Sequence, residues 1–178
     1  EATGHIKNPK AAIWILGTRA EVDLAVKEYM RKLNSIDTGK IKYKRKKRKD
    51  HRCLTAGVVS WPISIQQFID DIEKQEENKK EILAWRDKTM DWLKNQYNES
   101  LKGVCMHIDE SHFHIHFFVV GDAQRIHPGL RAELVDNIRI ADPKRRFVAH
   151  KKGLTLWLDD YHAAVGKLFS LSRKENSK

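Results

Sequence analysis

Three histidines that alternate with apolar residues are the part of this chain best suited to chemistry. His112, His114 and His116 share one side of the two-residue period of a strand. The other side of that period is wholly apolar: Phe113, Ile115, Phe117 and Val119. The alternation predicts a strand with one face in a core and three imidazoles on the opposite face. Because neutral imidazole is the commonest metal ligand in proteins, the pattern points first to metal binding.

A carboxylate and a fourth histidine are expected to join this row from a neighbouring strand. Residues 103–111 have the pattern of a strand followed by a polar turn, so a hairpin would place His107 and Glu110 close to the histidine row. The expected metal ligands are His107, Glu110, His114 and His116. Imidazoles with one carboxylate suit Mn²⁺ or Mg²⁺ and tolerate Co²⁺ or Zn²⁺. The alternative is a polar sheet face without a metal; four donors on adjacent strands favour the metal.

The composition fits a single globular, basic domain that spans residues 1–178. Hydrophobic residues make up 40% of the 178, and 34 Lys and Arg against 24 Asp and Glu give a net charge of +10. A surplus of this size favours a polyanionic partner, with nucleic acid as the first candidate. Charge alone also leaves a ribosomal or a membrane-surface protein open.

The basic residues are densest over residues 40–49, and a smaller cluster lies at residues 144–146. A charge run is often only a solvated loop, but in a basic protein it suits a phosphate backbone equally well, and Tyr43 offers a ring for base stacking. The candidate DNA-binding residues are Lys42, Tyr43, Lys44, Arg45, Lys47, Arg48, His112, Lys144, Arg145 and Arg146.

The two cysteines, Cys53 and Cys105, lie in apolar segments without CxxC spacing and are predicted to be buried free thiols of a reducing cytoplasm. No signal peptide is visible, and no stretch approaches the roughly 18 apolar residues of a membrane span. We therefore expect a cytoplasmic protein without a membrane partner. Because the chain begins at Glu1 rather than Met, some N-terminal sequence is expected to be trimmed.

Periodicity and turn residues predict alternating strands and helices. Capping boxes at Thr18–Glu21 and Ser64–Gln67 mark two helix starts, and Trp61-Pro62 is expected to end a strand. The expected elements are strand 11–16, helix 19–33, strand 52–60, one or two helices between 65 and 97, strands 103–109 and 112–120, a short helix at 130–135 and a final helix from Gly153. This order predicts an α+β sandwich: a central antiparallel sheet with helices packed on one face and a metal on the other, open face.

The histidine segment resembles a known family. His-hydrophobe-His on a central strand is the signature of the HUH endonucleases, and residues 107–116 resemble the HxDExxPHxH motif of the MobV (Mob/Pre) plasmid-mobilisation relaxases. Residues 158–173 also resemble that family's C-terminal stretch. The resemblance covers roughly the last 75 residues, and the first 100 match only in layout. Where the family has Thr-Pro before its HxH pair, this chain has His112-Phe113.

The resemblance implies an HUH-nuclease-like (RRM-like) fold and a divalent metal on the motif histidines His107, His114 and His116, with Glu110 as the acidic residue between them. It also implies a covalent intermediate on a nucleophilic side chain. Tyr161, on the final helix where replication initiators and transposases place their tyrosine, is the first candidate. Tyr161 also lies on an apolar stripe, as a core aromatic would. His5 is the second candidate, because MobV-like proteins use an N-terminal histidine.

The implied function is metal-dependent nicking and rejoining of single-stranded or melted plasmid or mobile-element DNA through a 5′-phosphodiester intermediate. The protein would act as a relaxase or a rolling-circle replication initiator of bacterial or mobile-element origin. An auxiliary domain or host replication and transfer proteins are possible partners. Three alternatives stay open: an HUH transposase, a non-catalytic single-strand-binding module and a histidine-based phosphodiesterase of small molecules.

Overall fold

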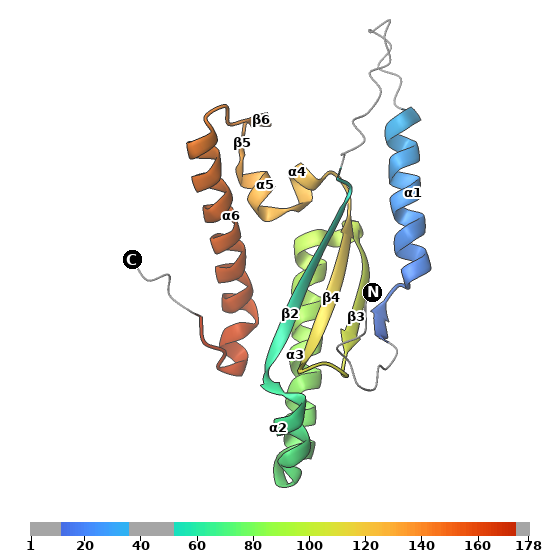
Figure 1. Ribbon diagram of the computed structural model, residues 1–178, viewed down its shortest axis with the longest axis vertical. Helices are drawn as coiled ribbons and strands as arrows, with labels where there is room; N and C mark the ends of the chain where they lie inside the picture. Colours follow the sequence, from blue (N-terminus) through green and yellow to red (C-terminus); the bar gives the residue numbers. More distant parts are fainter. Residues whose placement is uncertain (1–11, 36–51, 174–178) are drawn as a thin grey trace, which may run out of the picture.

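The computed structural model describes residues 12–35 and 52–173 of the chain (Figure 1). Its centre is a four-stranded antiparallel sheet with the strand order β1-β3-β4-β2. The strands are β1 Ile13–Leu16, β2 Leu54–Ser64, β3 Leu101–His107 and β4 His112–Val120. The expected antiparallel sheet of an α+β protein is therefore confirmed, with the histidine strand β4 in its interior and β2 at an edge.

Helices and a small hairpin surround this sheet. The longer helices are α1 Arg19–Ser35, α3 Gln75–Tyr97 and α6 Pro143–Ala164. The shorter helical segments are α2 Ile65–Asp70, η1 Ile72–Lys74, η2 Asn98–Ser100, α4 Ala123–Ile126, α5 Pro128–Ala132 and η3 Gly166–Phe169. Strands β5 Leu134–Val135 and β6 Ile138–Arg139 form the separate hairpin.

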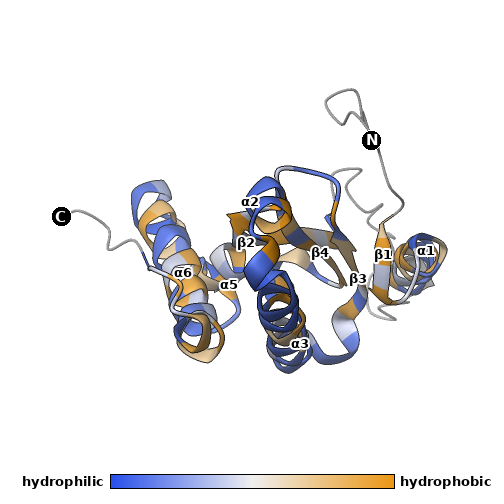
Figure 2. Cartoon of the chain, turned by 90° about the horizontal axis from the view of Figure 1, so that it is seen from below, coloured by the Kyte–Doolittle hydropathy of each residue, from blue (hydrophilic) through white to orange (hydrophobic). Residues whose placement is uncertain are grey.

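The apolar face of β4 packs against α3, and this contact forms the main core. Ile115 and Phe117 are 0% and 1% exposed, and α3 supplies Trp85 and Leu93, both fully buried. Figure 2 shows α3 along one side of the sheet. Burying a side chain of this size stabilises the fold by about 1.5–3 kcal/mol. The predicted alternation along β4 is thus confirmed: its apolar residues fill the core and its histidines face away.

Both predicted helix starts are present. In the first turn of α1, the Glu21 backbone N–H donates to Thr18 Oγ1 at 3.2 Å. At α2, the Gln67 N–H donates to Ser64 Oγ while the Ser64 N–H donates to Gln67 Oε1 at 3.0 Å. These bonds satisfy backbone donors that a helix start would otherwise leave unpaired.

The expected end of the second strand at Trp61-Pro62 is wrong. Strand β2 continues to Ser64, because it lies at the edge of the sheet and its pairing with β4 is irregular between Ser60 and Ser64. At an edge strand or a bulge, proline removes no hydrogen bond that the sheet needs.

The last helix begins ten residues earlier than expected, and the expected helix at 130–135 gives way to α5 and β5. Asp142 caps α6 by accepting the N–H of Lys144 at 2.7 Å, and Pro143 occupies the first turn. Gly153 lies inside α6. A β-carbon at this position would stand 2.7 Å from the Pro128 carbonyl oxygen, so a residue with a side chain does not fit there. Close packing between α5 and α6, rather than a helix end, explains this glycine.

A buried acidic residue ties α5, the small hairpin and α6 together. The Glu133 carboxylate, on a residue that is 7% exposed, accepts from Arg139 at 3.0 Å and lies 2.9 Å from His150 Nδ1. The His127 ring stacks beside His150, and its Nδ1 accepts the Leu130 N–H at the start of α5. The cluster is a structural link at the end of the molecule where α6 begins.

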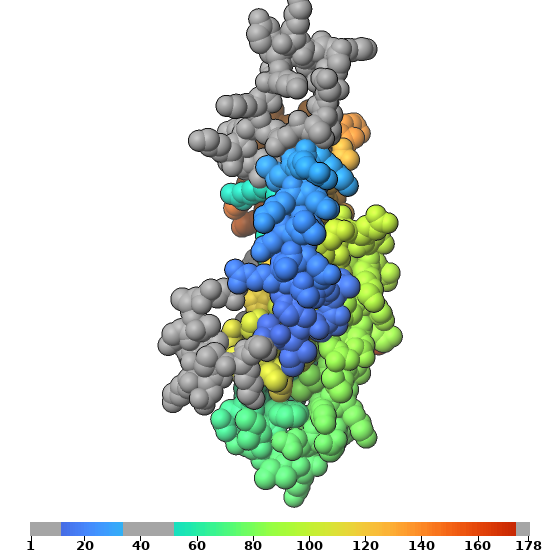
Figure 3. Space-filling view, turned by 90° about the vertical axis from the view of Figure 1, so that its right-hand side faces the viewer, coloured from blue at the N-terminus to red at the C-terminus, as the bar shows by residue number. Residues whose placement is uncertain are grey.

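Helices are not confined to one face of the sheet, contrary to the expectation. Val22 on α1 is 5% exposed, and a β-carbon on Gly103 of β3 would stand 2.6 Å from Val22 Cγ2. Trp14 on β1 stacks on Phe118 of β4, on the face away from α3. Figure 3 shows β1 and α1 as a continuous blue band over this side of the molecule. Helix α1 therefore covers part of the face that also carries the histidines.

Candidate metal centre

The pairing of β3 with β4 places the histidines on one face of the sheet. His107 lies opposite His114, and Cys105 lies opposite His116. Directly opposed residues of an antiparallel pair point to the same side. The three imidazole rings have centroids 4.8–5.1 Å apart, so they form a compact group. We call the face that carries this group the histidine face.

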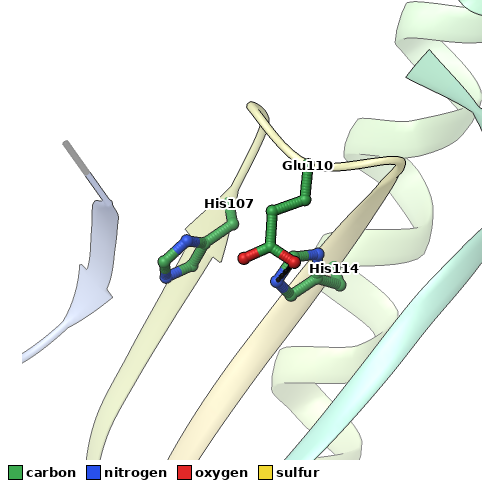
Figure 4. Close-up of side chains that lie close together, drawn as sticks. All are labelled: His107, Glu110 and His114. Carbon is green, nitrogen blue, oxygen red and sulfur yellow. Dashed lines mark ion pairs between the residues drawn. The ribbon is translucent and has the colours of Figure 1, made fainter. Parts of the chain in front are cut away.

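Glu110 reaches this group from the connection between β3 and β4. Its Oε2 lies 3.7 Å from His114 Nε2 (Figure 4). One ligand atom each from His107, Glu110 and His114 can be chosen so that all lie within 4.8 Å of one another. The structure therefore brings together three of the four expected ligands, and the His116 ring lies beside them.

A backbone contact orients His114. His114 Nδ1 lies 2.9 Å from the His112 carbonyl oxygen, which can only accept, so Nδ1 is the donor of this contact and Nε2 is the nitrogen left to bind a metal. Nε2 lies on the side of the Glu110 carboxylate, 3.7 Å from Oε2. An imidazole nitrogen and a carboxylate oxygen at this separation can both act as ligands of one cation. The donor set thus fits a divalent metal.

Asp109 is an acidic neighbour of His107 that is not among the residues expected from the sequence. Its Oδ1 lies 3.9 Å from His107 Nδ1, while Cys105 Sγ lies 3.8 Å from the other ring nitrogen, Nε2. The Asp109 side chain is 4% exposed, so its charge acts on the imidazole with little screening. Its place two residues after His107, on the turn of the hairpin, is the signal that could have identified it.

Two hollows flank the histidines. A cavity of about 330 Å³ lies between the histidine face and α1, and one of about 260 Å³ lies toward β2. His116 lines both cavities. His112, an expected DNA contact, lines the second one, with Nδ1 3.2 Å from Ser111 Oγ. A ligand bound at the histidines would therefore have space on either side of it.

Tyr161 does not lie with the histidines. The Trp85 indole N–H donates to the Tyr161 hydroxyl at 2.9 Å, and Thr89 Oγ1 lies 3.1 Å from the same oxygen. Both partners belong to α3, which covers the opposite face of the sheet. Burial raises the pKa of the phenol, so the phenolate is harder to form there. The structure thus places Tyr161 as a core aromatic on the face of the sheet opposite the histidines, so the first candidate nucleophile does not face the candidate metal ligands.

The remaining expected site residues lie apart from the histidines or outside the described part of the chain. Lys144 and Arg145 are exposed at the start of α6, at the end of the molecule opposite the β3–β4 turn (Figure 1). Arg146 donates to the Ile140 carbonyl oxygen and lies 3.8 Å from Glu133, so it has a structural role. His5 and the basic run at residues 40–49 lie outside the described residues.

Both cysteines are free and buried, as predicted. Among the helices of residues 12–35 and 52–173, none is both long enough and apolar enough to cross a bilayer. Comparison with protein-family models, with curated proteins and with solved structures found no match to the chain. The functional argument therefore depends on the site itself.

Proposed function

We propose that this chain is a metal-dependent endonuclease and strand transferase of the HUH type, most similar to the MobV relaxases. It would nick and rejoin single-stranded or melted plasmid or mobile-element DNA as a relaxase or a replication initiator. The observation that carries the proposal is the convergence of ligand atoms from His107, Glu110 and His114 within 4.8 Å. These residues have the same spacing as the HxDE and HxH parts of the family's motif.

The residues have distinct roles in this proposal. His107, Glu110 and His114 hold a divalent cation such as Mn²⁺ or Mg²⁺, and His116 completes or adjusts the donor set. When bound, such a cation draws negative charge from a phosphate oxygen and thereby favours attack at phosphorus. The His112 carbonyl fixes the tautomer of His114, and the net charge of +10 favours the approach of DNA.

The nucleophile in the proposal is His5. Tyr161 is held on α3, and Tyr97 stacks on Phe117 in the core, so neither phenol reaches the histidine face. Attack by an imidazole nitrogen forms an N–P bond and breaks the bond between phosphorus and the 3′-oxygen. The 3′-oxygen takes up one proton from solvent and leaves as a hydroxyl. Return attack by a 3′-hydroxyl reverses these steps and rejoins the strand.

A non-catalytic module that binds single-stranded nucleic acid is the second candidate. Val58 on β2 pairs with His116 on β4 and is 52% exposed, and Leu54, also on β2, is 43% exposed. These exposed apolar side chains lie beside the histidines of a basic protein, where they can contact the bases of a single strand without any reaction. The two candidates differ in one respect, which is whether a covalent adduct forms.

The first test measures metal binding by titration calorimetry with MnCl₂ on the full chain. Replacing His114 by Gln should weaken Mn²⁺ binding at least tenfold, because it removes an oriented donor. His112→Gln is the matched control, since it changes a neighbouring imidazole on the same strand while leaving the carbonyl that orients His114. Equal Mn²⁺ affinity of His114→Gln and the unmodified chain would refute the metal centre.

The second test looks for chemistry. Incubation with a pool of single-stranded oligonucleotides and Mn²⁺ should give a covalent protein–DNA adduct by intact mass spectrometry, with the modified peptide containing His5. His114→Gln should abolish this adduct. DNA binding without any adduct, unaffected by His114→Gln, would favour the binding module over the nuclease.

A further inference from the structure

The cavity between the histidine face and α1 has a composition unlike the rest of the candidate site. Its wall includes Trp14, Phe118 and the buried Val22, and its volume of about 330 Å³ lies within the range of small-ligand sites. His107 and His116 also line it. A group in this cavity is therefore in contact with the same imidazoles that form the candidate metal centre.

The aromatic wall suits a flat ring. Trp14 and Phe118 stack on each other with centroids 6.0 Å apart and an interplanar angle of 28°. Trp14 is only half-buried, so part of its ring surface is available to the cavity that it lines. Aromatic side chains hold the bases of single-stranded nucleic acid by stacking, and losing one such contact typically weakens binding about tenfold or more.

Two charged side chains stand at the rim of the same cavity. Arg19 and Asp23 are four residues apart on α1, so they project from the same side of the helix. Within residues 12–35 and 52–173, neither side chain has a hydrogen-bond or ion-pair partner. A ligand that binds them therefore breaks no side-chain contact made within the described part of the chain.

The two rim groups have complementary demands. The Asp23 carboxylate accepts N–H groups, and the Arg19 guanidinium donates to ring nitrogens and carbonyl oxygens. Guanine alone among the DNA bases offers two adjacent N–H donors, at N1 and N2, beside two adjacent acceptors, O6 and N7. Thymine offers a single N–H donor. The chemistry of the rim therefore favours guanine.

The cavity toward β2 is different. It is lined by Ser60, Ser111 and His112, with Val58 as its aliphatic member, and it has no Trp, Tyr or Phe in its lining. A polar hollow of this kind suits a sugar, a hydroxyl group or water. The two sides of the candidate metal centre are thus unequal, and only the cavity beside α1 has an aromatic wall.

We propose that the cavity formed by Trp14, Phe118, Arg19 and Asp23 is a nucleobase pocket that selects guanine in the nucleotide next to the phosphate held at the histidines. This inference rests on the proposed function, because it takes the substrate to be a single strand of DNA. It adds a specificity determinant on α1, outside the histidine motif.

The experiment uses fluorescence anisotropy in the presence of Mn²⁺ to measure the binding of fluorescein-labelled hexathymidylate. One thymine at a time is replaced by guanine, by hypoxanthine (the base of inosine) or by 7-deazaguanine. Guanine at one position should tighten binding about tenfold. Hypoxanthine lacks the N2 amino group and should lose part of that gain, and 7-deazaguanine lacks the N7 acceptor and should lose another part.

Variants at two exposed residues show which side chain is responsible for each loss of affinity. Asp23→Asn should abolish the difference between guanine and hypoxanthine, and Arg19→Gln should abolish the difference between guanine and 7-deazaguanine. Glu28→Gln is the matched control, because Glu28 is an exposed carboxylate on α1 that does not line the cavity. Neither variant alters the core, so a loss cannot be attributed to unfolding.

Distinct outcomes separate the pocket from the nuclease. No advantage for guanine at any position, in a chain that still forms the covalent adduct, overturns the pocket and leaves the proposed function standing. Retained discrimination in both Asp23→Asn and Arg19→Gln overturns the assignment to this cavity. Competition by guanosine and inosine 5′-monophosphate, which requires no cleavage, repeats the comparison. Asp23-dependent preference for the guanine nucleotide supports the pocket even when no adduct forms.

Discussion

Replacing Tyr161 by Phe separates a structural hydroxyl from a catalytic one. The substitution keeps the ring, which stacks edge-on against Trp92, and removes only the oxygen. In the folded chain that oxygen accepts from the Trp85 indole N–H at 2.9 Å and lies 3.1 Å from Thr89 Oγ1. Trp85 and Thr89 are both 0% exposed, so water cannot replace the lost partner without a rearrangement.

The expected cost follows from the groups left behind. The Thr89 hydroxyl can turn toward a carbonyl of the preceding turn of α3, so its loss is small. The Trp85 N–H is left buried and unsatisfied, which typically costs about 1–3 kcal/mol. A central value of about 2 kcal/mol corresponds to a fall in Tm of roughly 4–8 °C for a chain of this size.

Two assays on the same preparation test this reasoning. Urea unfolding followed by tryptophan fluorescence should show the loss of stability, while the yield of covalent adduct with DNA at 20 °C should match that of the unmodified chain. Thr89→Val serves as the control: it leaves the bond between Trp85 and Tyr161 in place and should cost less. Unchanged stability together with complete loss of the adduct would refute the placement of Tyr161 as a core residue.

Three further outcomes are expected from the core and from buried titratable groups. Gly57→Ala should lower the free energy of unfolding by about 1–3 kcal/mol, because its β-carbon would stand 2.2 Å from Phe117 Cζ; an unchanged urea midpoint would contradict this. Burial raises the pKa of Tyr161 above 10.0, so the unfolded chain loses that proton first and stability should fall as the pH rises past 10, less steeply in Tyr161→Phe. Burial, and secondarily His150, lower the pKa of His127 below 6.5, so the unfolded chain gains that proton first. The stability measured by thermal unfolding should therefore decrease as the pH is lowered from 7 to 5. His127→Asn, which keeps the helix cap, should flatten this profile.

The parts of the fold that the sequence predicted are those decided by near neighbours. Strict alternation from His112 to Val119 can satisfy only a strand with one buried face, and the sheet has that arrangement. A hydroxyl followed three residues later by Glu or Gln is a complete local reason for a helix to begin, and both examples hold. The meeting of His107, Glu110 and His114 also follows from a short hairpin.

The errors concern contacts between distant segments. Which face of the sheet receives Tyr161 depends on α3, whose Trp85 is 76 residues away in the chain. Gly153 has the pattern of a helix boundary in isolation, and only the approach of Pro128 shows why a glycine lies inside α6. The cavity beside the histidines likewise combines β1, α1 and β4, and no local motif links those elements.

The short span of the candidate ligands has a consequence for how the chain folds. His107 and His114 belong to one hairpin, so few residues must be ordered to bring their side chains together and the entropy of loop closure is small. If the hairpin binds a cation as proposed, the cation can do so before the remainder of the fold exists, and it then adds less to equilibrium stability than its affinity suggests. The bound cation would then act on strand register. With His107 held opposite His114, a slip by one residue would be disfavoured from the start, because it would turn Phe117 to solvent and the imidazoles into the core.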